Sequence, residues 1–175
     1  MSGATLRELD ALDDARIDGL AQLLIDCVEG GASVSFMQPL APQRARAFWH
    51  GVGEAVARGE RALLVAEDDA GAIVGTVQLV LAQPENQPHR ADVAKMLVHR
   101  RARRRGLGEM LMRAAEQRAQ RAGKTLLVLD TVTGADGERL YTRLGWQRCG
   151  VIPDYALWPA GGLCATTVMF KPLPR

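Results

Sequence analysis

The stretch between residues 90 and 123 limits most strongly what this chain of 175 residues can fold into. The apolar run "RADVAKMLVH" predicts a strand, and "GLGEMLMRAAEQRAQRAG" predicts an amphipathic helix. Between them lie five arginines within six residues, followed by Gly106 and Gly108. A strand that runs through a glycine-containing turn directly into a helix is typical of α/β proteins. We therefore expect both element types to share one sheet.

The start of this helix is predicted to bind a diphosphate. The first amide groups of a helix have no partner within the helix and lie at the positive end of its dipole, so a phosphate docks there readily. Gly106 and Gly108 let an anion approach the backbone. Arg103, Arg104 and Arg105 add positive charge at the same place.

Charge is concentrated in this region of the sequence. Residues 99–124 hold nine Arg or Lys and two acidic residues, although the net charge of the whole chain is only +2. A general nucleic-acid-binding protein is more often basic over a whole face, so one local polyanion site fits better. Glu109 stands where a P-loop needs lysine, and Leu111 stands where the dinucleotide fingerprint needs glycine. Both of these phosphate loops are excluded.

The remaining segments predict an α/β (α+β) fold with a mixed sheet and helices on both faces. Hydrophobic periodicity and turn residues divide the chain into alternating elements, with no repeat and no linker, which favours a single domain over residues 1–175. We expect strands at 4–10, 90–99, 124–132, 146–152 and 163–171, a hairpin at 61–82, helices at 11–31, 42–59, 106–123 and 135–145, and loops at 30–40 and 153–162.

Composition excludes several classes of protein. No apolar run approaches the roughly 20 residues that span a bilayer, and the first residues lack the pattern of a signal peptide, so we expect a cytoplasmic protein that does not bind membranes. Cys27, Cys149 and Cys164 are odd in number and widely spaced. They suggest buried apolar residues rather than disulfides, and no metal site is predicted.

The segment "MLVHRRARRRGLG" resembles the pyrophosphate-binding motif of the GCN5-related N-acetyltransferases (GNAT), and "ERLYTRLGW" resembles a later segment of the same family. The resemblance implies a mixed, mostly antiparallel sheet of about seven strands, and acetyl-CoA as the cosubstrate without a metal. It also implies that acetyl-CoA is bound by two groups of residues. The backbone amides of Met96, Leu97 and Val98 polarise the acetyl carbonyl, and the diphosphate is bound by Arg103, Arg104, Arg105, Gly106, Leu107 and Gly108.

Acetyl transfer to an amine also needs an acid and a base. Tyr141 is protonated at neutral pH, since a tyrosine has a pKa of about 10, and it can donate a proton to the leaving thiolate; its position in the family motif agrees. Three residues compete for the role of base. The tail resembles the branch of the family that acetylates small amines, to which tabtoxin resistance proteins belong, and this implies Asp130. Asp92 matches the glutamate of histone-acetylating relatives, and His89 has a suitable pKa without adjustment.

Substrate selection is predicted to come from the loops at 30–40 and 153–162. They carry Phe36, Asp154, Tyr155 and Trp158, and aromatic rings with one carboxylate suit a small cationic amine. We therefore expect an acetyl-CoA-dependent N-acetyltransferase that acts on an amino-acid-like metabolite, toxin or antibiotic by direct attack in a ternary complex. The family commonly dimerises, so a homodimer is one expected assembly.

Two other functions remain open at this point. A nucleic-acid-binding module would use the basic run at 99–105, but no aromatic residue for base stacking occurs between Trp49 and Tyr141. A catalytically silent acyl-CoA sensor would bind acetyl-CoA without turnover. Replacing Tyr141 by phenylalanine would separate the sensor from the enzyme.

Overall fold

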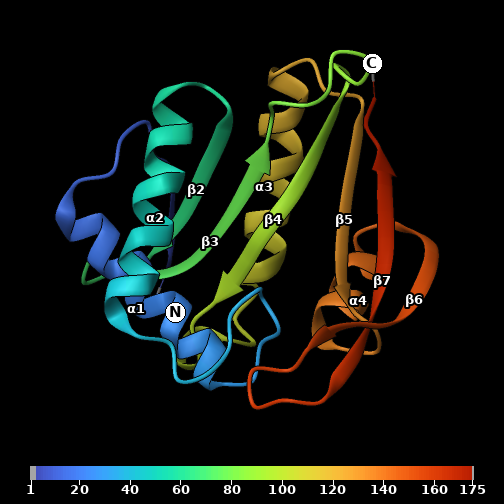
Figure 1. Cartoon of the computed structure of the whole chain (residues 1–175). Coiled ribbons are helices and arrows are strands. Elements are labelled where there is room, and N and C mark those ends of the chain that lie inside the picture. The colour runs from blue at the N-terminus through green and yellow to red at the C-terminus, as the bar shows by residue number, and fades with distance from the viewer. Residues whose placement is uncertain (1–2, 175) are drawn as a thin grey trace.

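Seven strands form one open sheet in the order β1-β2-β3-β4-β5-β7-β6 (Figure 1). The computed structural model describes residues 3–174. The strands are β1 (Thr5–Glu8), β2 (Arg61–Glu67), β3 (Ile73–Val80), β4 (Arg90–Val98), β5 (Leu126–Val132), β6 (Gln147–Leu157) and β7 (Leu163–Pro172). The helices are α1 (Asp14–Glu29), α2 (Pro42–Ala57), α3 (Leu107–Arg121) and α4 (Asp136–Arg143), with a 3₁₀ turn, η1 (Arg100–Ala102), before α3.

The pairing of β4 with β5 differs from the other pairings and shapes the middle of the sheet. It is parallel, whereas every other pair of neighbouring strands is antiparallel, and its register covers only Arg90–Asp92 against Leu126–Val128. Beyond Asp92 the two strands diverge, as Figure 1 shows. The edge of β4 from Val93 onward therefore faces a gap, and β5 offers it no ladder partner.

A β-bulge lies in β4 beside this gap. The register of β3 with β4 shifts between Gln78, which pairs with Ala94, and Thr76, which pairs with Leu97. Lys95 and Met96 thus oppose a single residue of β3, and Lys95 has a φ of 49°. A bulge of this kind re-aims side chains and interrupts pairing.

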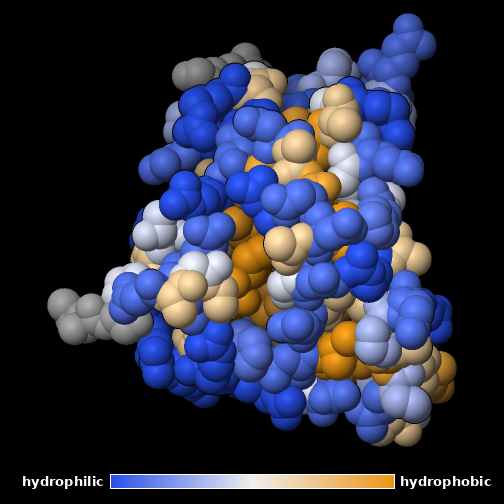
Figure 2. All heavy atoms as spheres, turned by 90° about the vertical axis from the view of Figure 1, so that its left-hand side faces the viewer, coloured by the Kyte–Doolittle hydropathy of each residue, from blue (hydrophilic) through white to orange (hydrophobic). Residues whose placement is uncertain are grey.

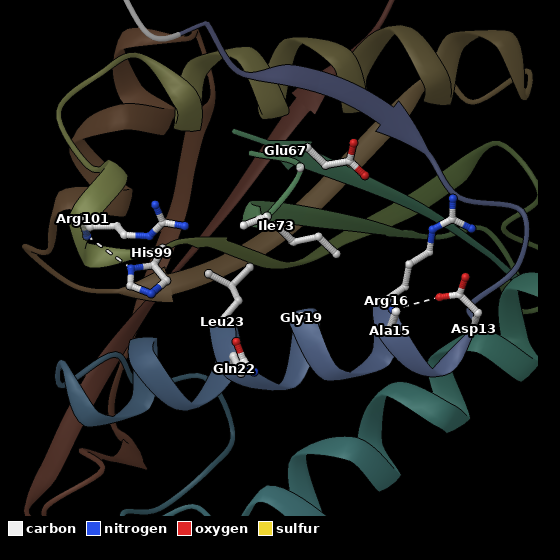
Figure 3. Close-up of a pocket in the computed structure, with 12 residues that line it drawn as sticks. Asp13, Ala15, Arg16, Gly19, Gln22, Leu23, Glu67, Ile73, His99 and Arg101 are labelled. Carbon is white, nitrogen blue, oxygen red and sulfur yellow. Dashed lines mark hydrogen bonds between the residues drawn. The ribbon is translucent and has the colours of Figure 1, made fainter. Parts of the chain in front are cut away.

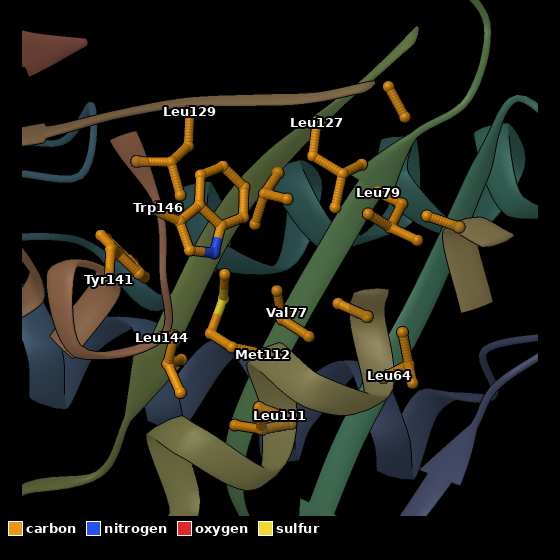
Figure 4. Packing of buried hydrophobic residues seen from close by; sticks show 14 of the residues in the cluster. Leu64, Val77, Leu79, Leu111, Met112, Leu127, Leu129, Tyr141, Leu144 and Trp146 are labelled. Carbon is orange, nitrogen blue, oxygen red and sulfur yellow. The ribbon is translucent and has the colours of Figure 1, made fainter. Parts of the chain in front are cut away.

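Helices cover both faces of the sheet, as the sequence predicts. α1 and α2 pack on one face around a core that includes Leu24, Trp49 and Leu63. α3 packs on the other face, where Leu111 and Met112 meet strand residues such as Val77 (Figure 4). Each helix contributes one apolar side to these cores, which is the arrangement that helical spacing of apolar residues produces.

The predicted loop at 153–162 is wrong over its first half. β6 continues to Leu157, and only residues 158–162 form the turn to β7. Ile152 pairs with Thr166 and Ala156 pairs with Cys164, so the residues from Pro153 to Tyr155 form a bulge within the strand. β6 is an edge strand, and proline is tolerated at edges and bulges because it needs no ladder partner there.

One cysteine also departs from expectation. Cys27 and Cys164 are buried, but Cys149 is exposed on β6. Burial raises the pKa of the Cys27 thiol to about 11, and its Sγ lies 3.6 Å from the carbonyl oxygen of Val98. A thiol with this pKa stays protonated at neutral pH and is not an activated nucleophile.

Candidate active site

The arginine run between β4 and α3 is mostly neutralised by the protein itself. Arg100 pairs with Asp26 at 2.9 Å and Arg101 pairs with Asp68 at 2.9 Å. Arg104 lies 3.6 Å from a carboxylate oxygen of Asp136 at the start of α4. The run therefore ties the loop to α1, to the β2–β3 turn and to α4.

The beginning of α3 leaves its amides available. Gly106 is the N-cap residue with a φ of 80°, and no side chain caps the first turn. Arg103 turns back and donates from Nε to the carbonyl oxygen of Val98 at 3.1 Å. Arg105 is exposed and has no ion pair within residues 3–174. Uncapped amides beside a free guanidinium form a suitable anion site.

The two glycines of this junction have different roles, which corrects the expectation that both make room for an anion. A Cβ added to Gly106 would meet nothing within 4 Å, and its positive φ favours glycine. A Cβ on Gly108 would lie 2.9 Å from Cδ2 of Leu140. Gly108 therefore makes room for α4 to pack against α3.

Asp130 and Tyr141 come together where β5 diverges from β4. Asp130 lies near the end of β5, is exposed, and accepts a hydrogen bond at 2.9 Å from Oγ of Thr166 on β7. Tyr141 lies on α4 and is 7% exposed. Burial raises the pKa of Tyr141, and the negative charge of Asp130 acts in the same direction. The two predicted catalytic groups are thus close enough to interact electrostatically.

A cavity of about 470 Å³ opens beside Asp130. Its walls come from the loop between α1 and α2, from the end of β5 and from the β6–β7 hairpin. Two hydrogen bonds hold the loop and the hairpin together: Ser33 Oγ donates to Leu157 O at 2.9 Å, and Gln38 N donates to Pro159 O at 3.0 Å. This arrangement is suited to enclosing a small acceptor next to the gap.

The four residues predicted to select the substrate divide into two pairs. Phe36 and Tyr155 line the cavity. Asp154 and Trp158 are outside its lining, because Asp154 lies in the bulge of β6 and Trp158 begins the turn after it. The carboxylate that lines the cavity is that of Asp130 on β5, whereas the sequence predicted that of Asp154.

The two other candidate bases lie at the start of β4, away from the bulge at Lys95 and Met96. Asp92 belongs to the part of β4 that pairs with β5, forms an ion pair with Arg90, and accepts a hydrogen bond from Gln83 at 3.1 Å. His89 precedes β4 and is exposed, and its carbonyl oxygen accepts from the amide of Thr125 at 2.8 Å. Neither residue lines the cavity that holds Asp130.

Sequence reasoning missed Lys95. It stands in the bulge of β4, its Nζ lies 3.1 Å from Oγ of Ser35, and the charge of Asp130 influences its pKa. A basic residue directly before "MLV" in an otherwise apolar part of the strand was the available signal.

A second cavity, of about 500 Å³, lies between α1, the β2–β3 hairpin and η1 (Figure 3). Its charged groups are engaged within the protein: Glu67 pairs with Arg7, Arg101 pairs with Asp68, and Asp13 caps α1. The side of the molecule turned to the viewer in Figure 2 is mostly hydrophilic, with hydrophobic residues visible only in small areas. Asp130 and Tyr141 do not line this cavity.

Within residues 3–174, no helix is both long and apolar enough to cross a membrane. In the same part of the chain, no group of three or more His, Cys, Asp or Glu side chains is placed to hold a metal ion.

The profile of the Acetyltransferase (GNAT) family matches residues 18–146. An uncharacterized N-acetyltransferase from the hisH–hisA intergenic region of Azospirillum brasilense is 30% identical over 166 residues, which cover 93% of this chain and 96% of that protein. The chain belongs to the GNAT acetyltransferase family. As such it is an acetyl-CoA-dependent N-acetyltransferase.

Solved GNAT structures share its fold. The protein yncA of Salmonella typhimurium, solved with its cofactor acetyl-CoA, superposes with a TM-score of 0.80 at 20% identity over 99% of this chain and 96% of that chain. A phosphinothricin acetyltransferase from Sinorhizobium meliloti in complex with acetyl-CoA gives 0.78 at 18% identity over 97% and 88% of the two chains. The expected GNAT-like mixed, mostly antiparallel sheet of seven strands is confirmed.

The residues of this GNAT chain fit acetyl-CoA. The diverging strands leave an unpaired edge on β4, the first turn of α3 is uncapped, and Gly106 has open space where a side chain would otherwise stand. An acyl carrier with a diphosphate can use these features together, because the amide groups at the start of α3 follow the edge of β4 directly in the chain.

Proposed function

We propose that this GNAT enzyme transfers the acetyl group of acetyl-CoA to the primary amine of a small molecule by direct attack in a ternary complex. The observation that carries the proposal is the carboxylate of Asp130, which lines the cavity, lies on β5 beyond its pairing with β4, and acts electrostatically on the ring of Tyr141. The unpaired edge of β4 begins where that pairing ends. These supply a proton acceptor, a proton donor and backbone amides.

The donor is held along β4 and the start of α3. Backbone amides of Met96, Leu97 and Val98 donate to the acetyl carbonyl oxygen and stabilise the oxyanion that forms there. Amides of Leu107 and Gly108, with the guanidinium of Arg105, hold the diphosphate. Arg103, Arg104 and Gly106 shape the loop that presents them.

The acceptor reacts from the cavity. Asp130 takes a proton from the ammonium group, and the neutral nitrogen attacks the thioester carbonyl. The C–N bond forms and the C–S bond breaks, and Tyr141 gives its proton to the departing sulfur. The nitrogen loses its second proton to solvent as the amide forms, and Tyr141 regains a proton from solvent. Burial keeps Tyr141 protonated, since it raises the pKa of the phenol.

The acceptor is an amino-acid-like metabolite, toxin or antibiotic. The fold similarity to phosphinothricin acetyltransferases is consistent with this class, and so is a cavity of about 470 Å³ that combines aromatic and polar walls. A reaction that consumes acetyl-CoA fits a cytoplasmic location. The homodimer stays a prediction.

The test is a CoA-release assay over amino acids, aminoglycosides, polyamines and peptides, followed by variants of the competing bases. Asp130→Asn should lower kcat about 10²- to 10⁴-fold with unchanged acetyl-CoA binding, because a positioned base contributes that much. Asp92→Asn and His89→Gln should change kcat less than about threefold. A large loss confined to Asp92→Asn or His89→Gln would move the base to that residue and contradict the proposal.

A further inference from the structure

Lys95 occupies an unusual place for a strand lysine. It stands in the bulge of β4 with a positive φ of 49°, and the residue that it contacts, Ser35, also has a positive φ of 77°. Its Nζ donates to Ser35 Oγ at 3.1 Å and lies 5.8 Å from the centre of the Phe48 ring. Two irregular backbone segments therefore converge on this ammonium group.

The surroundings of Lys95 form one wall of the acceptor site. Ser35 and Phe36 line the cavity that also holds Asp130. The ring of Phe36 meets that of Phe48 edge-on, with ring centres 5.3 Å apart. The ammonium group of Lys95 thus contacts one wall of the cavity, through Ser35, and Asp130 belongs to another wall of it.

Lys95 has no ion pair within residues 3–174. Its partners are a hydroxyl group, which accepts one of its three N–H bonds, and an aromatic ring, so none of the three has an anionic acceptor. Burial lowers the pKa of Lys95, and the negative charge of Asp130 opposes this shift from a distance too long for an ion pair. A partly buried cation without a counter-ion gains substantially when a ligand brings one.

We propose that Lys95 binds the carboxylate of the acceptor, so that the substrate is an α-amino-acid-type zwitterion whose ammonium group faces Asp130 and whose carboxylate faces Lys95. This inference rests on the proposed function and identifies the residue that selects its substrate. It narrows the proposed acceptors to those with a free carboxylate, because Asp130 lines the cavity and Lys95 contacts Ser35 of its wall.

The opposite placement of the two charges also orients the acceptor. A molecule with only an amine can bind Asp130 in many orientations. A molecule with an adjacent carboxylate is held at two points, which fixes the direction from which its nitrogen approaches the gap. Orientation of this kind contributes to catalysis as well as to binding.

The experiment compares amino acids with their α-carboxamides. CoA release is measured with L-phenylalanine, L-leucine and L-glutamate, each beside its amide, for the wild type, Lys95→Met and Lys95→Arg. Lys124→Met is the matched control, since Lys124 binds only the carbonyl oxygens of Leu81 and Pro88, away from the cavity. The amine of an amide is less basic and therefore more often neutral, so a preference for the acid reports binding of the carboxylate.

We expect the wild type and Lys124→Met to prefer acids over amides in kcat/KM. Lys95→Met should lose this preference roughly ten- to hundredfold, mainly through KM for the acids, and Lys95→Arg should restore part of it. Equal losses for acids and amides would show that Lys95 only anchors the loop through Ser35. That result, or a wild type that uses amides as well as acids, would overturn the inference and leave the proposed function standing.

If no amine is acetylated by the wild type, the proposed function fails and Lys95 is still tested by binding. The three amino acids are then added to the acetyl-CoA complex, and melting temperatures are compared. An increase in the wild type that is absent in Lys95→Met supports the anion site, and no increase, or the same increase in both proteins, overturns it.

Discussion

The environment of Tyr141 decides what this residue can contribute. Its ring packs against Trp146 with ring centres 6.0 Å apart (Figure 4), and its hydroxyl forms no hydrogen bond within residues 3–174. A core tyrosine usually directs its hydroxyl to a partner. A hydroxyl without one is available to a ligand, since it is not among the fully buried polar atoms of residues 3–174 that lack a partner, and the pKa shift keeps it protonated.

Replacing Tyr141 by phenylalanine should therefore separate catalysis from folding. We expect kcat to fall about 10²-fold, because the leaving thiolate loses its proton donor, while the Kd of acetyl-CoA changes little. The melting temperature should stay the same or rise slightly, since no hydrogen bond in the described part of the chain is lost. Steady-state kinetics, calorimetric titration and thermal melting measure the three quantities.

Tyr155→Phe is the matched control, because it removes the other tyrosine, on β6. In that variant the absorbance of tyrosinate should be absent at pH 10, since burial and the charge of Asp130 raise the pKa of the remaining Tyr141 above its ordinary value of 10.0. An unchanged kcat in Tyr141→Phe would assign Tyr141 to the core alone. A wild type that binds acetyl-CoA without any turnover would favour the sensor.

Residues carried by a sequence motif could be placed in advance, and residues positioned by a backbone irregularity could not. Tyr141 and the start of α3 follow from segments that resemble GNAT motifs. Lys95 depends on a bulge in β4, and a bulge arises from pairing with β3, which is distant in the sequence. The close approach of Leu140 to Gly108 could not be predicted either, because Leu140 belongs to another helix.

At the level of elements, one ion pair determines how α3 is held. The side chain of Glu116 on α3 is only 13% exposed and bonds to two groups beyond the helix. It accepts from Trp146 Nε1 at 3.1 Å and from Lys171 Nζ at 2.8 Å. Lys171 also donates to the carbonyl oxygen of Leu144. Glu116 thus links α3 to β7 and to the end of α4.

Replacing Glu116 by alanine should lower the free energy of unfolding by about 2–4 kcal/mol, because Lys171 and the indole N–H lose their acceptor in a largely buried place. Glu109→Ala is the matched control on the same helix. Its pair with Arg113 is exposed, so the loss should be less than about 0.5 kcal/mol. Urea unfolding measures both, and equal losses would contradict the linking role of Glu116.

Strand boundaries show the same limit of sequence reasoning. The sequence predicts a strand at 124–132, and β5 lies there, between β4 and β7 in the sheet. Pro153 and Asp154 predicted a loop because proline and aspartate disfavour strands. The edge position of β6 and its pairing with β7 outweigh these local preferences, and only the sheet order reveals that position.

At the scale of the molecule, the sheet has two parts that meet through three residue pairs of β4 and β5. On the face covered by α3, one core cluster extends across this junction. Leu111 and Met112 of α3 belong to it together with Leu127 and Leu129 of β5 (Figure 4). The other side of the junction opens into the gap. A ligand that fills the gap contacts both parts, so its binding should stabilise the whole fold.

Acetyl-CoA at about 100 times its Kd should raise the melting temperature by roughly 5–10 °C, the equivalent of about 2.7 kcal/mol in a protein of this size. Arg105→Glu should raise Kd about tenfold, which halves this shift at the same concentration, because a carboxylate replaces the one arginine of the run that has neither an ion pair nor a backbone acceptor. Arg121→Glu makes the same charge change at the far end of α3 and should keep the full shift. Equal weakening by both variants would mean that overall charge, and not the start of α3, attracts the diphosphate.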